Sequence, residues 1–176
     1  TWRYIVPTVQ PISSWNTVGF NDTGWNLGNG GFGYGDGDDN TILTPPLWSV
    51  FTRKTFNISD TPKISSAILT MDYDDAFVAY LNGVEIARSN IGVTGTPPPF
   101  NMAAFKEHEG LLYQGQLPEN FPIDMNLLKL IMVNGTNVLS IQVHNVNNNS
   151  SDLTSIPYLS FGIKDASVFY GPPPSW

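Results

Sequence analysis

The segment FVAYLNGVEIAR, residues 77–88, constrains the fold of this chain more than any other. Its Asn82-Gly83 pair lies between two runs that are rich in β-branched and aromatic residues. Asn-Gly is the preferred pair for a two-residue type I′ turn, because both of its residues adopt positive φ angles readily. The sequence therefore predicts a β-hairpin whose tip is Asn82-Gly83.

Short apolar runs separated by turn residues continue along the rest of the chain. The 176 residues include 16 glycines and 14 prolines, and helical periodicity is nearly absent. This spacing is typical of sandwiches and barrels. Further strands are predicted for four segments: residues 49–58, 67–75, 137–145 and 157–165. We therefore expect an all-β fold, an antiparallel β-sandwich with long loops and at most one short helix.

The third of these strands has the clearest alternation. Leu139, Ile141 and Val143 alternate with polar residues, so we expect one face of the strand in the core and the other facing outward. The single helix is predicted to begin after Asp124, an N-cap residue, and to stop at Asn134-Gly135.

Composition limits the class of protein and of partner. A hydrophobic content of 41% is enough for one core, so we expect one domain over residues 1–170 and the start of a Pro-rich linker at 171–176. The net charge of -7, with eight Lys and Arg, argues against nucleic acid as a partner. No apolar run approaches the roughly 20 residues of a membrane helix, so no membrane insertion is expected. The absence of cysteine excludes disulfides and thiolate zinc sites.

Carboxylates gather at the predicted loops. Asp36 and Asp38 alternate with glycine, a spacing by which a loop turns successive oxygens toward Ca²⁺. Asp74 and Asp75 end a predicted strand, and such close carboxylates repel unless a cation compensates. We expect one structural Ca²⁺ that draws on some of five residues: Asp36, Asp38, Asp74, Asp75 and Asp152. The alternatives are an exposed Asp/Gly turn and a structural role at the strand junction.

Aromatic residues in the long loops indicate a binding surface. Aromatic content is 12% and charged content only 13%, a balance that suits neutral polar ligands. Sugar rings stack their C–H faces on aromatic side chains while amides and carboxylates bind the hydroxyls. The loops 26–48 and 92–120 supply the predicted ligand-binding residues: Tyr34, Asn40, Trp48, Phe100 and Tyr113. Burial of these aromatics beneath a loop is the alternative.

Several motifs together resemble a known family. TWRY, FNDTGW, GFGYGDGDD, FTRKTF, DYDDAFVAYLNGVEIARSN, NGTNVLSIQVHN and SSDL follow in the order of galactose-binding-like jelly-roll domains, and similar domains bind sugar in family 2 glycoside hydrolases. The resemblance spans Trp2 to about Phe161 and implies a non-catalytic accessory module of a secreted or cell-surface bacterial protein. A Pro-rich insert at residues 95–122 departs from many relatives, so loop functions do not transfer directly.

These features leave three functions open. The first is a non-catalytic carbohydrate-binding module whose partners are a polysaccharide or oligosaccharide and the neighbouring domains of its parent protein. The second is a structural or protein-interaction module without a glycan ligand. The third is a hydrolase, for which His144 and Asp152 would form part of a triad, although no G-x-S-x-G motif supplies a nucleophile.

Overall fold

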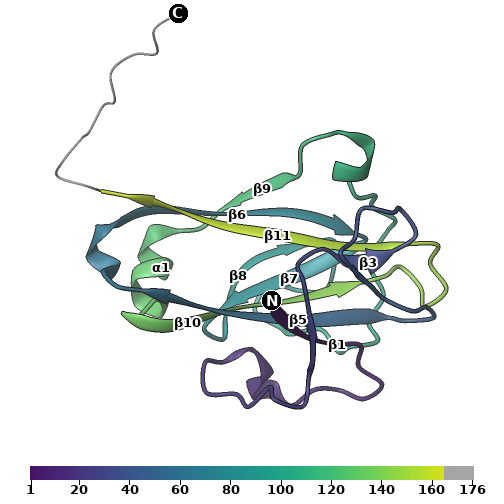
Figure 1. Ribbon diagram of the computed structural model, residues 1–176, viewed down its shortest axis with the longest axis horizontal. Coiled ribbons are helices and arrows are strands. Elements are labelled where there is room, and N and C mark those ends of the chain that lie inside the picture. The colour runs from purple at the N-terminus through teal and green to yellow at the C-terminus, as the bar shows by residue number, and fades with distance from the viewer. Residues whose placement is uncertain (165–176) are drawn as a thin grey trace, which may run out of the picture.

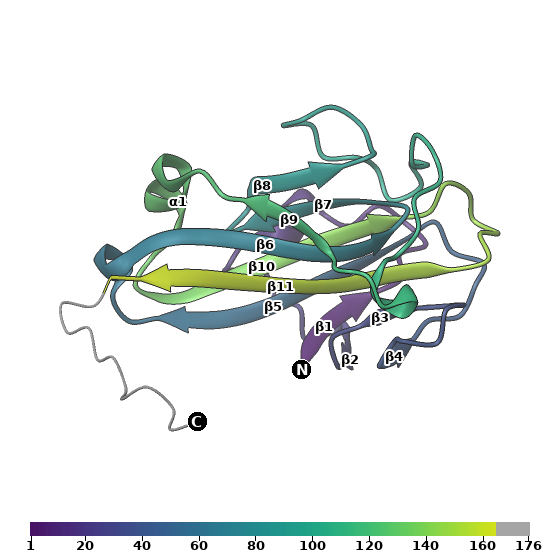
Figure 2. The same ribbon diagram turned by 90° about the horizontal axis from the view of Figure 1, so that it is seen from above.

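The computed structural model describes residues 1–164 and consists of two β-sheets packed face to face (Figures 1 and 2). One sheet has the order β2-β1-β5-β10-β7-β8 and the other has the order β4-β3-β11-β6-β9. The strands are β1 (Trp2–Ile5), β2 (Asn26–Gly28), β3 (Phe32–Tyr34), β4 (Thr41–Ile42), β5 (Ser49–Ile58), β6 (Ile64–Asp74), β7 (Ala76–Leu81), β8 (Val84–Ser89), β9 (Glu119–Pro122), β10 (Gly135–His144) and β11 (Leu153–Ile163). The predicted all-β sandwich is confirmed, and its strand pairs are antiparallel apart from the parallel pair β3–β4.

The predicted helix is α1 (Met125–Ile131) at one end of the sandwich (Figure 1). The Asp124 side chain accepts a hydrogen bond from the amide of Asn126 at 2.9 Å, so it caps the helix as expected. Residues 1–164 also contain three 3₁₀ turns: η1 (Ser13–Asn16), η2 (Thr61–Lys63) and η3 (Leu112–Gln114). None of the helices in residues 1–164 has the length and apolar character needed to cross a membrane.

The predicted hairpin connects β7 to β8. Leu81 pairs with Val84 across the turn, and Asn82 and Gly83 both have positive φ, 53° and 91°. These angles match a type I′ turn, so the prediction from the Asn-Gly pair is confirmed.

The two faces of β10 differ from the expected pattern. Leu139, Ile141 and Val143 pack between the sheets, as predicted. The alternate residues Gln142 and His144, expected to face outward, are also buried. They are buried because Trp15, Ile91 and Ala104, which lie outside the strands, cover the outer face of this sheet. There they form a second apolar cluster with residues of β5 and β7: Phe51, Ala76, Val78 and Tyr80.

The predicted strand boundaries hold for some strands and shift for others. The segment 49–58 coincides with β5, whereas β6 and β11 begin three and four residues earlier than the predicted 67–75 and 157–165. The long segment 26–48 contains three short strands instead of continuous loop. The expected domain boundary at residue 170 and the Pro-rich segment 171–176 lie outside the described residues.

Candidate functional site

A first acidic cluster lies in the turn between β3 and β4. One carboxylate oxygen from each of Asp36, Asp38 and Asp39 lies within 4.8 Å of the others. Gly35 has a φ of 104°, which lets the chain turn sharply before Asp36. Gly33 leaves room for the cluster, because a Cβ there would lie 2.5 Å from Asp39 Oδ2. The glycines of this segment therefore bring the three carboxylates together.

Most oxygens of this first cluster have no hydrogen-bond donor. Asp36 Oδ2 accepts a hydrogen bond from Thr154 Oγ1 at 2.6 Å, whereas Asp36 Oδ1 and both oxygens of Asp38 and of Asp39 are buried without a partner. Burial raises the pKa of Asp39 to about 8 and that of Asp38 to about 6, and the charge of Asp36 reinforces both shifts. A hard cation with oxygen ligands would satisfy these atoms and compensate their charge.

A second acidic cluster joins three segments that are distant in the sequence. Asp74 ends β6, Glu109 lies in the insert between β8 and β9, and Asp152 precedes β11. One carboxylate oxygen from each lies within 4.8 Å of the other two. Burial raises the pKa of Asp74 to about 8, and the charges of Asp75, Asp152 and Glu109 add to this effect. This cluster also has the charge and the ligand type of a cation site.

Asp75 has a different role from its neighbour. Its Oδ1 accepts a hydrogen bond from the amide of His108 at 2.9 Å, and its Oδ2 accepts one from the amide of Val146 at 2.6 Å. Both carboxylate oxygens are therefore engaged by backbone, and Asp75 ties two loops to the strand junction. The five acidic residues expected around one ion are thus divided: two in the first cluster, two in the second, and Asp75 outside both.

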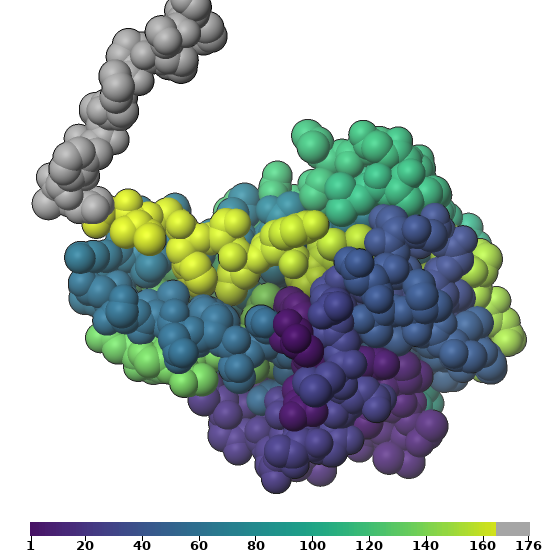
Figure 3. All heavy atoms as spheres, viewed as in Figure 1, coloured from purple at the N-terminus to yellow at the C-terminus, as the bar shows by residue number. Residues whose placement is uncertain are grey.

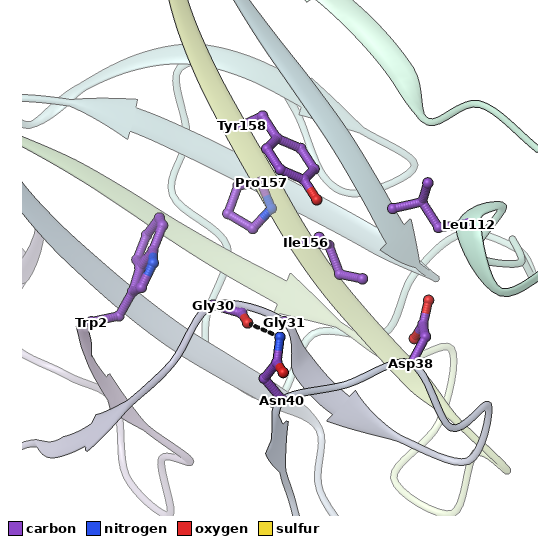
Figure 4. Close-up of a pocket in the computed structure, with 9 residues that line it drawn as sticks. All are labelled: Trp2, Gly30, Gly31, Asp38, Asn40, Leu112, Ile156, Pro157 and Tyr158. Carbon is purple, nitrogen blue, oxygen red and sulfur yellow. Dashed lines mark hydrogen bonds between the residues drawn. The ribbon is translucent and has the colours of Figure 1, made fainter.

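A groove of about 480 Å³ lies on the outer side of β11 (Figure 4). Figure 4 shows Trp2 at one end, Asp38 and Leu112 at the other, and Tyr158 on β11 between them. In Figure 3 the yellow atoms of β11 are flanked by blue atoms of the β3–β4 segment and by green atoms of the segment before β9. Nine residues line the groove: Trp2, Gly30, Gly31, Asp38, Asn40, Leu112, Ile156, Pro157 and Tyr158.

The lining of the groove combines aromatic rings with polar groups. Tyr158 is 53% exposed, and Trp2 is partly buried with its ring packed edge-on against Phe32 at 6.3 Å between centroids. Asn40 donates a hydrogen bond from Nδ2 to the carbonyl of Gly30 at 2.9 Å, which fixes the amide at the groove wall. Such a surface offers stacking faces and hydrogen-bonding groups together.

The predicted ligand-binding residues do not form one surface. Asn40 lines the groove, and Tyr113, 42% exposed, directly follows its wall residue Leu112. Tyr34 is only 7% exposed, and its hydroxyl donates to the carbonyl of Ser150 and accepts from Asn145 Nδ2. A buried ring of this kind has no face for a sugar.

Trp48 and Phe100 also lie away from the groove. Both are partly buried, and Phe100 packs against the apolar cluster outside the six-stranded sheet. Sequence reasoning missed Tyr158. The alternation of Tyr158 with Pro157 and Leu159 in the last strand is the signal that would have placed Tyr158 on the outer face.

The proposed catalytic pair is not assembled. His144 is fully buried, and its Nδ1 lies 3.0 Å from the carbonyl of Met102, while Asp152 belongs to the second acidic cluster. Burial lowers the pKa of His144 to about 4, so the imidazole is neutral at physiological pH. Its interactions are those of a structural histidine beneath a loop.

No protein-family model matches this sequence, and no curated protein matches it either. Among solved structures, the chain is similar to part of a β-glucuronidase from glycoside hydrolase family 2, with 17% identity over 82% of this chain and 13% of that chain (TM-score 0.48). A β-glucuronidase from an uncultured Clostridium species has 19% identity over 82% of this chain and 21% of that chain (TM-score 0.46). The α-L-rhamnosidase of Aspergillus terreus has 16% identity over 77% of this chain and 15% of that chain (TM-score 0.44).

This chain therefore spans less than a quarter of the length of each of these enzymes. TM-scores below 0.5 do not establish a common fold, so these similarities say nothing about the ligand of this chain. The function proposed below therefore rests on the residues of this chain alone.

Proposed function

We propose that this chain is a non-catalytic carbohydrate-binding module and that its sugar site is the groove along β11. The observation that carries the proposal is the combination, in one concave surface, of Trp2 and Tyr158 with the amide of Asn40. Aromatic rings supply the stacking surface for pyranose C–H groups, and the polar side chains bind hydroxyls. The low charged content of the chain, 13%, fits a neutral glycan.

A structural Ca²⁺ at the first acidic cluster is the second part of this proposal. Asp38 belongs both to that cluster and to the groove wall, and Asn40 follows two residues later. Asp36, Asp38 and Asp39 would hold the ion through their unpartnered oxygens. The ion would order the β3–β4 turn and thereby the polar side of the groove.

The setting we propose is that of a galactose-binding-like jelly-roll module in a secreted or cell-surface bacterial protein. The motif order from TWRY to SSDL supports it. The neighbouring domains of that protein are the further partners. A single shallow groove binds an oligosaccharide weakly, so useful affinity would come from several modules or domains acting together.

A structural or protein-interaction module is the alternative function. It is favoured by exposed apolar residues between β8 and β9, where Val93, Phe105 and Leu117 are 72%, 70% and 87% exposed. Exposed apolar side chains of this kind contribute to protein contacts when they lie together.

A panel of soluble and insoluble polysaccharides separates the two functions. We expect the wild type to be retained by at least one neutral polysaccharide, and Tyr158→Ala to lose that retention. Phe105→Ala is the matched control, because it removes an exposed aromatic residue that does not line the groove. If no polysaccharide retains the wild type, the interaction module becomes the better account.

A further inference from the structure

We propose that Asp74, Glu109 and Asp152 form a second divalent-cation site, separate from that of the β3–β4 turn, which fastens the long insert to the sandwich. The site does not depend on the glycan groove. It lies where the end of β6, the insert before β9 and the β10–β11 loop meet, at the end of the sandwich opposite α1 (Figure 1).

The burial of Asp74 is the observation that distinguishes this site from a solvated acidic surface. Asp74 is only 3% exposed, and its Oδ1 has no hydrogen-bond partner. Within residues 1–164, none of the three carboxylates forms an ion pair with Lys, Arg or His. A buried ionised carboxylate without donor or counter-charge is costly, and a cation coordinated by all three groups removes that cost.

The surrounding contacts hold the other two ligands near Asp74. Asp75 accepts hydrogen bonds from the amides of His108 and Val146, so it fixes the residue before Glu109 and the start of the loop that carries Asp152. Both loops are thus anchored by protein contacts before any ion binds. Preorganisation of this kind lowers the entropic cost of bringing the ligands together around a metal ion.

The hydrogen bonds that Glu109 and Asp152 accept leave oxygen atoms that could bind a cation. Tyr113 donates a hydrogen bond to Glu109 Oε2 at 3.2 Å, and Ser151 donates one to Asp152 Oδ1 at 2.8 Å. Each of these carboxylates therefore keeps one oxygen without a hydrogen bond from protein. Oxygen ligands from flexible loops, completed by water, suit Ca²⁺ better than the rigid octahedral Mg²⁺.

The consequence is an insert that opens locally less often when Ca²⁺ is bound. Glu109 is the ligand contributed by the insert, and Lys106 lies exposed three residues before it. Trypsin cleaves after Lys106 only when this segment opens locally, so the rate of that cleavage reports on the clamp. Bound Ca²⁺ should slow the cleavage, because it stabilises the closed segment.

The test combines the number of bound ions with local proteolysis. We expect calorimetric titration of the wild type to give two Ca²⁺ per chain, Glu109→Gln to give one, and Asp38→Asn also to give one. Ca²⁺ should slow trypsin cleavage at Lys106 at least fivefold relative to EGTA in the wild type and in Asp38→Asn. In Glu109→Gln this protection should be absent.

Glu107→Gln is the matched control, since Glu107 is an exposed acidic residue of the same segment outside the cluster. It should keep two ions and full protection. An equal loss in Glu107→Gln would mean that Ca²⁺ screens an acidic surface without a defined site, and the proposal would be wrong. A wild type that binds one ion or none, or a Glu109→Gln variant with unchanged protection, would also overturn it. Asp152→Asn, checked for its native circular dichroism spectrum, repeats the test from another loop. None of these readouts involves a glycan, so they succeed or fail independently of the proposed sugar site.

Discussion

Arg53 Nε donates a hydrogen bond to Asp22 Oδ2 at 2.8 Å, which joins β5 to the loop before β2. The guanidinium is almost completely buried, donates also to the carbonyls of Trp15 and Thr17, and lies 5.1 Å from the centre of the Phe20 ring. This one cation therefore organises the loop that covers the outer face of the six-stranded sheet. The carboxylate of Asp22 in the FNDTGW motif therefore has a structural role.

Asp22→Asn should destabilise the protein, because it leaves the Arg53 charge buried without its counter-ion. The expected loss in the free energy of unfolding is about 2 kcal/mol, less than for a fully buried pair since the Asp22 side chain is 21% exposed. Urea denaturation measures it. Asp60→Asn breaks the exposed pair with Lys63, which is longer at 3.6 Å, and should change stability by less than about 1 kcal/mol. Equal losses in the two variants would contradict this account.

Ile141→Ala tests the core between the sheets. Ile141 is completely buried among residues of both sheets, so its truncation leaves a cavity and should cost about 2 to 5 kcal/mol. Leu130→Ala, at a position that is 83% exposed on α1, should have an effect near zero. Chemical denaturation of both variants provides the comparison, and a loss below about 1 kcal/mol for Ile141→Ala would show that the strand is placed wrongly.

His144 should make stability depend on pH. Because its pKa is lowered to about 4 in the folded protein from 6.5, the unfolded chain binds the proton more readily. The contribution of the neutral His144 to the free energy of unfolding is complete above pH 6.5 and is lost as the pH falls through 4. The total loss is about 3 kcal/mol. The raised pKa values of Asp39 and Asp74 act with the opposite sign, so the comparison must be made between variants.

His144→Gln supplies that comparison. The free energy of unfolding should fall less steeply in this variant than in the wild type between pH 6.5 and 4. Parallel pH profiles for the two proteins would exclude His144 as the source of the effect.

Local signals in the sequence were sufficient to predict several structural elements. Asn82-Gly83 defines its turn through two positive φ angles, and Asp124 caps α1 through a bond to a residue two positions away. Each depends on neighbours in the chain, so local chemistry determines it. The alternation in β10 likewise identified the residues that pack between the sheets.

The acidic clusters show where such reasoning ends. Asp39 could have been included, because it directly follows Asp38 in the same turn. Nothing local links Glu109 to Asp74 or Asp152, which come together only through the fold. The outer face of β10 was assigned to solvent for the same reason, since the loops that cover Gln142 and His144 are distant in the sequence.

Removal of Ca²⁺ should lower the melting temperature. Binding to the folded state alone stabilises it by about 2.7 kcal/mol at a ligand concentration 100 times Kd. We expect a melting temperature several degrees higher in millimolar Ca²⁺ than in EGTA, and a smaller difference in Asp38→Asn. Differential scanning calorimetry measures both. If the chelator changes the melting temperature of neither protein, the first acidic cluster does not hold a structural ion.

The most direct test of the central claim is calorimetric titration with an oligosaccharide from a polysaccharide that retains the wild type. Tyr158→Ala should weaken binding about tenfold, equivalent to about 1.4 kcal/mol, because a stacking face of the groove is lost. Tyr158→Phe keeps that face and should bind within a factor of about three of the wild type. The melting temperatures of both variants should remain close to that of the wild type, since Tyr158 is 53% exposed. Unchanged affinity in Tyr158→Ala would contradict the assignment of the groove along β11 as the sugar site.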